Sequence, residues 1–284
     1  MSQQTSRVGP LGPDQVHKAV VLARGLGTRM QRPDSRAQLD GAQAAAAAAG
    51  HKALIPVGRP FLDYCLSALA DAGFTAVCLV VAPGASPLRD RYEREARPTR
   101  LTIDFAVQDH PLGTADAVAA AEAFVGASLF AVLNGDNYYP AEALRGLRRL
   151  PPPGLVAFER GALVEQGGLD PDRVRRYALV RMAVDGELER IVEKPEPEEL
   201  EALGADAHVS MNCWLFTPAI FEACRRIRPS ARGELELTDA VAYARAELGQ
   251  RFATHRFSGP VLDLTSRTDI AAVAARLAPI RVVL

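Results

Sequence analysis

The most informative segment of the sequence is Val20-Val21-Leu22-Ala23-Arg24-Gly25-Leu26-Gly27-Thr28-Arg29-Met30. It passes from an apolar, strand-like segment into a loop with two closely spaced glycines and an arginine near its end. Glycine tolerates backbone angles that other residues avoid, so successive N–H groups can converge on an anion, and Arg29 adds a permanently charged fork of donors. The pattern predicts a phosphate-binding loop at the end of a buried strand.

Three other interpretations of this loop compete with the first. A dinucleotide-binding fingerprint needs a third glycine for close helix packing, and Met30 stands in its place, which disfavours a Rossmann dehydrogenase. A P-loop needs Lys followed by Ser or Thr after the last glycine, and Thr28-Arg29 follows here, which excludes a P-loop nucleoside triphosphatase. A tight strand-to-loop turn without any ligand stays open when the loop is considered alone.

The composition is that of a globular chain without a strong overall charge. With 284 residues and 48% hydrophobic content, the chain can bury one large domain or two closely packed ones. Its 33 Lys and Arg residues balance 34 Asp and Glu residues, so we expect no nucleic acid and no membrane as partner. No apolar run approaches the roughly 20 residues of a membrane span. Residues 1–17 lack the apolar centre of a secretory signal, so we expect a flexible leader and a cytoplasmic protein.

The cysteines stand singly in apolar surroundings, without C-x-x-C pairs or a neighbouring histidine cluster. This spacing favours reduced core residues over zinc ligands. The four residues are Cys65, Cys78, Cys213 and Cys224.

Buried-strand and helix patterns alternate over the first half of the chain, about 18–150. A helix is expected from Pro60 to a stop at Gly73, and another over 114–124. This alternation predicts a mainly parallel sheet covered by helices on both faces, with ligands beyond the carboxyl ends of the strands. The expected strands are 19–23, 76–81, 103–107 and 129–134.

From Pro151 the pattern changes to a mixed α+β half that extends over about 151–284. Its expected strands are 155–158, 177–182, 188–192 and 209–216, and its expected helices are 218–227, 238–248 and 268–277. One biased segment remains in the first half: residues 31–50 include six consecutive alanines, 44–49. Alanine favours helix but offers no large apolar stripe, so we expect a short exposed helix or a mobile flap there rather than core.

Six short motifs follow one another along the chain. They are G-x-G-T-R-M at 25–30, K-A-L-I-P-V at 52–57, Gln108 with Gly113-Thr114-Ala115, N-G-D-N at 134–137, I-V-E-K-P at 191–195, and Leu262-Asp263. In this order, residues 18 to about 275 resemble the sugar-1-phosphate nucleotidyltransferases, also called nucleoside diphosphate-sugar pyrophosphorylases. The resemblance implies a Rossmann-like GT-A-type α/β fold with a mixed, mainly parallel central sheet and helices on both faces.

The resemblance also implies a reaction and its partners. A sugar 1-phosphate would attack the α-phosphorus of a nucleoside triphosphate, giving a nucleoside diphosphate-sugar and pyrophosphate. Such a displacement depends on positioning and charge neutralisation more than on a general base. By resemblance, Arg29, Lys52 and Lys194 are the catalytic cations. The nucleotide would be bound in the half about 18–150 by Leu22, Ala23, Gly25, Gly27, Thr28, Gln108, Gly113 and Thr114.

The remaining implied sites are a metal site and an acceptor site. Asp136 and Asp263 would share Mg²⁺, which prefers carboxylate and phosphate oxygens. Glu193, Lys194 and Asn212, in the half about 151–284, would bind the acceptor, with Lys194 neutralising the sugar phosphate. From the residues alone, Gln108 and Asn212 are equally explained as polar residues at strand ends.

The chain departs from the family pattern at four places. Arg24 stands where these loops commonly have a small residue, and His51 replaces the proline that usually precedes the lysine. The gap between Arg29 and Lys52 is longer than usual, so the insertion 31–50 would lie beside the triphosphate site, where we hypothesise a lid or a subunit contact. Ala178 replaces a glycine near the sugar, which leaves the acceptor's identity open.

Three rival functions remain at this point. A catalytically silent sensor or assembly protein would keep the nucleotide pocket, but the charged residues of the motifs favour turnover. A GT-A glycosyltransferase would need a D-x-D pair, and Asp136-Asn137-Tyr138 lacks the second aspartate. Nucleotidyl transfer to a non-sugar phosphate such as phosphocholine would use the same nucleotide half. Formation of a homo-oligomer is suggested by analogy alone.

Overall fold

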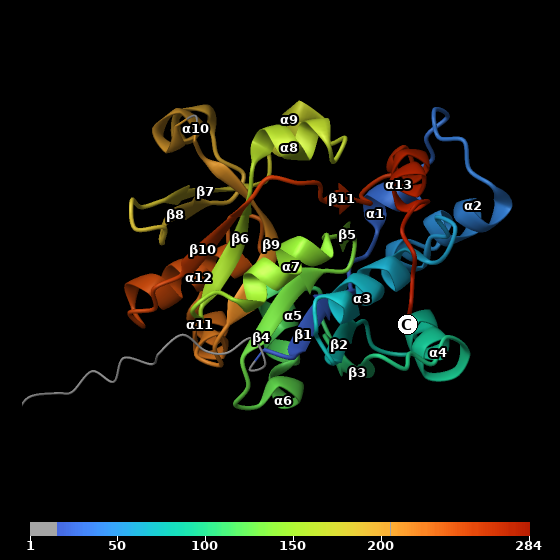
Figure 1. Ribbon diagram of the computed structural model, residues 1–284, viewed down its shortest axis with the longest axis horizontal. Coiled ribbons are helices and arrows are strands. Elements are labelled where there is room, and N and C mark those ends of the chain that lie inside the picture. The colour runs from blue at the N-terminus through green and yellow to red at the C-terminus, as the bar shows by residue number, and fades with distance from the viewer. Residues whose placement is uncertain (1–15, 205) are drawn as a thin grey trace, which may run out of the picture.

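The computed structural model describes residues 16–204 and 206–284. Within these residues, a nine-stranded sheet has the order β10-β6-β9-β4-β1-β2-β3, and β7 and β8 extend from β9 off that path (Figure 1). A separate antiparallel pair joins β5 (Asn137–Tyr138) to β11 (Leu262–Asp263). The strands of the main sheet are β1 (Lys18–Leu22), β2 (Ala76–Val81), β3 (Thr102–Val107), β4 (Phe130–Asn134), β6 (Gly154–Phe158), β7 (Ala178–Met182), β8 (Leu188–Val192), β9 (His208–Phe216) and β10 (Ala253–Phe257).

The central strands are buried on both faces because their sequences are apolar except at a strand end, where β1 starts with Lys18 and β4 ends with Asn134. In β1, Ala19 and Val21 belong to one core cluster and Val20 to the other. Such continuous apolar runs are typical of parallel strands covered on both sides. β1 pairs in parallel with β2 and β4, β2 pairs in parallel with β3, and β9 is antiparallel to β4 and β6. The expected mixed, mainly parallel sheet is confirmed.

Helices cover both faces of this sheet. On one face lie α3 (Phe61–Asp71) and α7 (Ala141–Arg148), and on the other α5 (Thr114–Ala120), α11 (Ile220–Arg226) and α12 (Leu237–Ala246) (Figure 1). The shorter helices and peripheral elements are α1 (Thr28–Gln31), α2 (Gly41–Ala48), the 3₁₀ helix η2 (Lys52–Leu54), α4 (Pro87–Asp90), the π-helix η3 (Arg91–Glu95), α6 (Glu122–Val125), α8 (Arg160–Glu165), α9 (Pro171–Val174), α10 (Pro197–Leu203) and α13 (Asp269–Leu277).

Three local predictions need correction. The helix expected over 114–124 is two helices, because Ala121, at φ −90° and ψ 5°, leaves the helical conformation between α5 and α6. Strand β10 was not predicted, since its sequence Ala-Thr-His-Arg-Phe is largely polar, as suits a strand at the edge of the sheet. The alanine-rich segment does form a short helix, α2, yet Ala47 is fully buried, because small side chains let the helix approach the core closely.

Most of the leader, residues 1–15, lies outside the described residues. Val16 and His17 belong to the fold: Val16 is buried, and the carbonyl of His17 accepts hydrogen bonds from the N–H groups of Thr75 and Ala76 at 3.0 and 3.1 Å. All four cysteines are buried free thiols, as expected. No helix in the described part of the chain has the length and apolarity to cross a bilayer.

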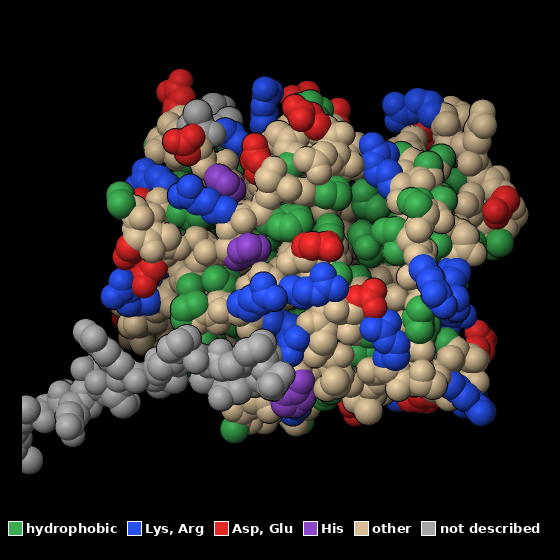
Figure 2. Space-filling model, in the orientation of Figure 1, with side chains coloured by type: hydrophobic (Ala, Val, Ile, Leu, Met, Phe, Trp, Pro, Cys, Tyr) green, Lys and Arg blue, Asp and Glu red, His purple; other side chains and the backbone are tan. Residues whose placement is uncertain are grey.

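Charged side chains of both signs are interspersed over the face shown in Figure 2. This mixture agrees with the near balance of acidic and basic residues in the sequence. On this face, therefore, recognition depends on local groups rather than on one extended charged surface.

Candidate nucleotide cleft

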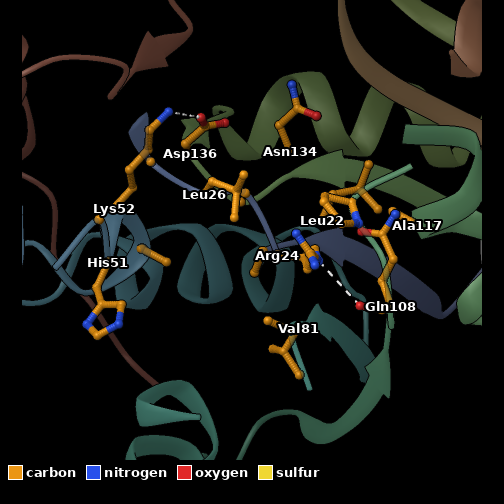
Figure 3. A pocket seen from close by; sticks show the side chains of 18 of the residues that line it. Leu22, Arg24, Leu26, His51, Lys52, Val81, Gln108, Ala117, Asn134 and Asp136 are labelled. Atoms are coloured by element: carbon orange, nitrogen blue, oxygen red, sulfur yellow. Dashed lines mark hydrogen bonds and ion pairs between the residues drawn. The ribbon is translucent and has the colours of Figure 1, made fainter. Parts of the chain in front are cut away.

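A cleft of about 670 Å³ opens at the carboxyl ends of the parallel strands, where the topology predicts a ligand site. Leu22 at the end of β1, Val81 at the end of β2 and Asn134 at the end of β4 all line it (Figure 3). Since these strands are neighbours in the sheet, loops that are far apart in the sequence converge on one space.

The glycine-containing loop forms one wall of this cleft. Gly27 has a φ of +62°, and a Cβ at this position would collide with the backbone of Gly50. Gly25 has ordinary backbone angles and open space around it, so only Gly27 is required as glycine by its conformation. Arg29 is exposed and lines the cleft, and no ion pair holds it among the residues that the structure describes. The predicted nucleotide-binding residues of this loop line the cleft: Leu22, Ala23, Gly25, Gly27 and Thr28.

The insertion 31–50 packs against this loop. Helix α2 begins with a capping box between Asp40 and Gln43, and the Gln43 amide also donates to the carbonyl of Pro56 at 3.0 Å. The segment that follows brings Gly50 into contact with Gly27 and places His51 and Lys52 in the lining of the cleft. The insertion is thus packed against the loop, and its role as a lid or subunit contact stays a hypothesis.

Lys52 and Asp136 meet across the cleft. Lys52 Nζ donates to Asp136 Oδ2 at 2.8 Å, with the two side chains 19% and 29% exposed. Lys52 comes from η2 and Asp136 from the turn between β4 and β5, 84 positions later in the chain (Figure 3). Partial burial strengthens such a pair relative to one on the open surface. A cation and a carboxylate are therefore fixed next to the glycine-containing loop.

The β5–β11 pairing brings Asp263 beside Asp136. Asp263 is in register with Asn137, and the N–H of Leu264 donates to the carbonyl of Asp136 at 2.9 Å. Burial and the negative charge of Asp136 both raise the pKa of Asp263, while the charge of Arg173 opposes that rise. Asp136 lines the cleft, whereas Asp263 is buried and does not belong to the lining. The two carboxylates repel each other, and a cation between them would relieve this repulsion.

The side chain of Asp263 is already held by two hydroxyl donors and one ion pair that sequence reasoning missed. Thr265 Oγ1 donates to Asp263 Oδ1 at 2.7 Å, Tyr177 OH donates to Oδ2 at 2.5 Å, and Arg173 Nη2 lies 2.8 Å from the same oxygen. Only Thr265 is close in sequence, and no local pattern relates Tyr177, 86 positions away, to this carboxylate. Asp263 is therefore more enclosed than an open metal ligand.

The opposite end of the cleft contains Gln108, which is buried with 4% of its surface exposed. Its amide nitrogen donates to the carbonyl of Gly113 at 3.0 Å and to Asp116 Oδ2 at 2.8 Å, so only its amide oxygen is left for a ligand. Gly113, at φ +123°, has no space for a Cβ because the backbone of Leu235 lies against it. Gly113 and Thr114 both line the cleft, but the Thr114 hydroxyl accepts a hydrogen bond from the N–H of Leu237 at 2.9 Å.

Of the three predicted acceptor residues, only Asn212 lines the cleft. Its amide donates to Asn134 Oδ1 at 3.3 Å, and its Oδ1 accepts from the indole of Trp214 at 3.2 Å. Glu193 and Lys194 follow β8, and neither belongs to the lining, because the β7–β8 hairpin extends away from the main path of the sheet (Figure 1).

The surroundings of Glu193 and Lys194 differ from those of a cleft residue. Lys194 is exposed and has a φ of +47°, which places it in a tight turn after the strand. Burial, followed by the negative charge of Glu236, raises the pKa of Glu193 to about 7, and the charge of Arg232 opposes this rise. The structure does not bring these two side chains to the cleft, and their acceptor role stays a prediction.

Comparisons with known proteins show the family to which the chain belongs. The Nucleotidyl transferase family matches residues 18–259. The chain is 29% identical over 231 residues to UTP--glucose-1-phosphate uridylyltransferase AglF of Haloferax volcanii, covering 79% of this chain and 82% of AglF.

It is 33% identical over 228 residues to a glucose-1-phosphate thymidylyltransferase of Streptomyces antibioticus, covering 80% of this chain and 56% of that protein. It likewise covers 56% of the low-salt glycan biosynthesis nucleotidyltransferase Agl11 of Haloferax volcanii, at 28% identity and 79% of this chain. A crystal structure of a UDP-glucose pyrophosphorylase complexed with UDP-glucose shares the fold, with a TM-score of 0.69, 19% identity, and coverage of 94% of this chain and 100% of that one. The chain thus belongs to the nucleotidyl transferase family.

Proposed function

We propose that this protein condenses a nucleoside triphosphate with a sugar 1-phosphate to give a nucleoside diphosphate-sugar and pyrophosphate. The family and the activities named for its relatives support this reaction class. The observation that carries the proposal is the contact of Lys52 Nζ with Asp136 at 2.8 Å, beside the glycine-containing loop and next to Asp263. Cationic and carboxylate groups in one cleft are what a reaction between two phosphates needs.

In this reaction an oxygen of the sugar phosphate forms a bond to the α-phosphorus as the bond to the bridging oxygen of pyrophosphate breaks. The exposed fork of Arg29 would bind the β- and γ-phosphates together with the N–H groups of the loop. Lys52 would turn from Asp136 to the α-phosphate, where negative charge increases in the transition state. The attacking phosphate is already an anion, so the proposal requires no general base.

Mg²⁺ belongs to the proposal as the cofactor, held by Asp136 and Asp263. The donor set fits: two carboxylates lie side by side, the charge of one raises the pKa of the other, and Asp136 lines the cleft. When bound, the ion would neutralise charge on the reacting phosphates. The side chain of Asp263 would then be oriented by its contacts with Arg173, Tyr177 and Thr265.

On the acceptor side, Asn212 offers an amide in the cleft for a hydroxyl or phosphate oxygen. The proposed acceptor roles of Glu193 and Lys194 depend on movement of the β7–β8 hairpin toward the cleft, because neither side chain lines it. The proposal therefore assigns sugar contacts first to Asn212.

The test measures pyrophosphate release in Mg²⁺ from each common nucleoside triphosphate, combined in turn with several sugar 1-phosphates and with phosphocholine. We expect release with at least one sugar 1-phosphate, and a loss of about 100-fold or more in Asp136→Asn, since one carboxylate and the partner of Lys52 are both removed. Asp71→Asn is the matched control, because Asp71 pairs with Arg100 at the surface.

Two outcomes would replace the proposed reaction, and a third would change the residues assigned to it. Tight nucleotide binding without pyrophosphate release from any pair would favour a sensor or assembly protein. Release with phosphocholine but with no sugar 1-phosphate would favour nucleotidyl transfer to a non-sugar phosphate. Near-normal release by Asp136→Asn would remove this carboxylate from the reaction.

A further inference from the structure

The cleft has two chemically different ends (Figure 3). Lys52 and Asp136 form the charged end. The other end is lined by apolar side chains around the guanidinium of Arg24 and the amide of Gln108; these apolar residues are Leu22, Val81 and Ala117. Apolar walls with a few polar groups suit a flat ring better than a phosphate.

Arg24 is held only weakly at this end. Its Nε donates to the carbonyl of Gln108 at 3.3 Å and its Nη2 to the carbonyl of Asp109 at 3.5 Å, both near the upper limit of a hydrogen bond. Its Nη1 is buried without a hydrogen-bond partner in residues 16–204 and 206–284, and no carboxylate of that part of the chain forms an ion pair with Arg24. A charged, partly buried group with an unused donor is costly unless a ligand completes its bonding.

Gln108 supplies the complementary half of the same site. Its amide nitrogen is bound to Gly113 and Asp116, which leaves Oε1 as an acceptor. The guanidinium of Arg24, by contrast, can only donate. A ligand edge that fits both groups needs an acceptor facing Arg24 and an N–H facing Gln108.

We propose that Arg24 is a nucleobase-specificity residue that selects bases with an oxo group next to a ring N–H, namely uracil, thymine or guanine. The oxo oxygen accepts from the fork of Arg24, which turns into the cleft and gives up its two long hydrogen bonds, while the ring N–H donates to Gln108 Oε1. Adenine and cytosine carry an amino donor at the corresponding exocyclic position, which faces the donors of Arg24. This inference rests on the proposed function for the nature of the ligand.

The position of Arg24 separates this role from phosphate binding. The loop has a second arginine, Arg29, which lines the cleft as an exposed residue, whereas Arg24 is half-buried and donates to the carbonyl of Gln108. Arg24 and Arg29 should therefore respond differently to ligands that contain phosphates without a base.

The experiment measures binding of UTP, dTTP, GTP, ATP, CTP and inorganic tripolyphosphate by calorimetry, for the wild type, Arg24→Met and Arg29→Met. Methionine keeps much of the arginine stem and removes the donors, and thermal unfolding of each variant checks that it folds. We expect the wild type to prefer at least one oxo-bearing nucleotide over ATP and CTP. Arg24→Met should bind that nucleotide roughly tenfold or more weakly, the loss of one charge-assisted hydrogen bond, and should bind tripolyphosphate as the wild type does. Arg29→Met should weaken tripolyphosphate and all five nucleotides alike.

Three results would overturn the inference. The first is a wild-type preference for ATP or CTP. The others are an Arg24→Met variant that loses as much affinity for tripolyphosphate as for nucleotides, and an Arg24→Met variant that keeps the base preference of the wild type. Arg24→Leu serves as a second variant if Arg24→Met does not fold, and it should likewise lose the base preference because it also removes every donor. Because binding is measured without turnover, a protein that shows this pattern but releases no pyrophosphate would refute the proposed function and leave the base-specificity role intact.

Discussion

The buried carboxylate of Asp63 should contribute several kcal/mol to the free energy of unfolding, and its removal should also weaken nucleotide binding in the cleft. Asp63 lies in α3 and is completely buried. Its carboxylate accepts hydrogen bonds from Arg91 Nε at 3.0 Å, from Tyr92 OH at 2.9 Å and from Arg59 Nε at 3.3 Å. Burial raises the pKa of Tyr92, so its phenol stays a donor.

Replacing Asp63 by Ala removes the carboxylate acceptor, so the guanidinium of Arg91 and the buried hydroxyl of Tyr92 lose this hydrogen-bond partner. Breaking a buried ion pair on one side costs about 3–5 kcal/mol, and the stranded Tyr92 hydroxyl accounts for part of that sum. We therefore expect Asp63→Ala to lower the free energy of unfolding by about 3–5 kcal/mol. Asp71→Ala breaks the pair with Arg100, in which Asp71 is 43% exposed, and should cost less than about 1 kcal/mol.

Urea unfolding at pH 7 and 25 °C, followed by circular dichroism, measures these values for Asp63→Ala, Arg91→Met and the double variant. Arg91 and Tyr92 belong to η3, which continues from α4, and Leu88 of α4 lines the cleft. The double variant should cost at least about 1 kcal/mol less than the sum of the single ones, and nucleotide affinity should fall in both single variants. A loss below about 1 kcal/mol in Asp63→Ala, or simple additivity, would refute the reasoning.

Two further predictions concern backbone strain and pH. Gly27→Ala should lower the free energy of unfolding by about 2 kcal/mol or more, because φ is +62° and the backbone of Gly50 blocks the Cβ. Gly25→Ala is the control and should change the free energy of unfolding by less than about 0.5 kcal/mol, because the space around Gly25 is open. Equal denaturation midpoints for the two variants would contradict this prediction. Glu193 has a pKa of about 7 in the fold against 4.5 without it, so the native state binds the extra proton and stability is lost as pH rises between those values. Glu193→Gln should therefore be more stable than the wild type at pH 8, by on the order of 1–3 kcal/mol, and this difference should vanish near pH 4.5. Urea unfolding at both pH values measures the difference, and the same difference at pH 8 and pH 4.5 would argue against the raised pKa of Glu193.

Local sequence patterns predicted the parallel strands because each strand carries its own signal. Ala76–Val81 is apolar at every position, and such a run is buried on both faces wherever it pairs. Chain order then places the loop after β1 and the turn after β4 at the same edge of the sheet, so the proximity of the glycine-containing loop to Asp136 could be expected. Whether these residues bind nucleotide and Mg²⁺ stays a prediction.

Other features of the site could not be predicted, since they depend on contacts between distant parts of the chain. The motif I-V-E-K-P predicts that the turn after β8 belongs to the site. The β7–β8 hairpin instead extends away from the cleft, and Lys194 therefore does not line it. Two of the groups around Asp263, Arg173 and Tyr177, come from one segment about 90 positions earlier in the chain, and no periodic pattern relates that segment to Asp263.

The amino-acid sequence alone predicts the class of sheet, a loop with two glycines after the first strand, and the charged residues available for phosphate chemistry, because strand burial and backbone freedom are properties of short segments. Only the tertiary structure decided which of those charges share a space. It set Lys52 against Asp136, enclosed Asp263 with Arg173, and turned Arg24 toward Gln108, because side-chain partners are chosen by the packing of elements that lie many residues apart.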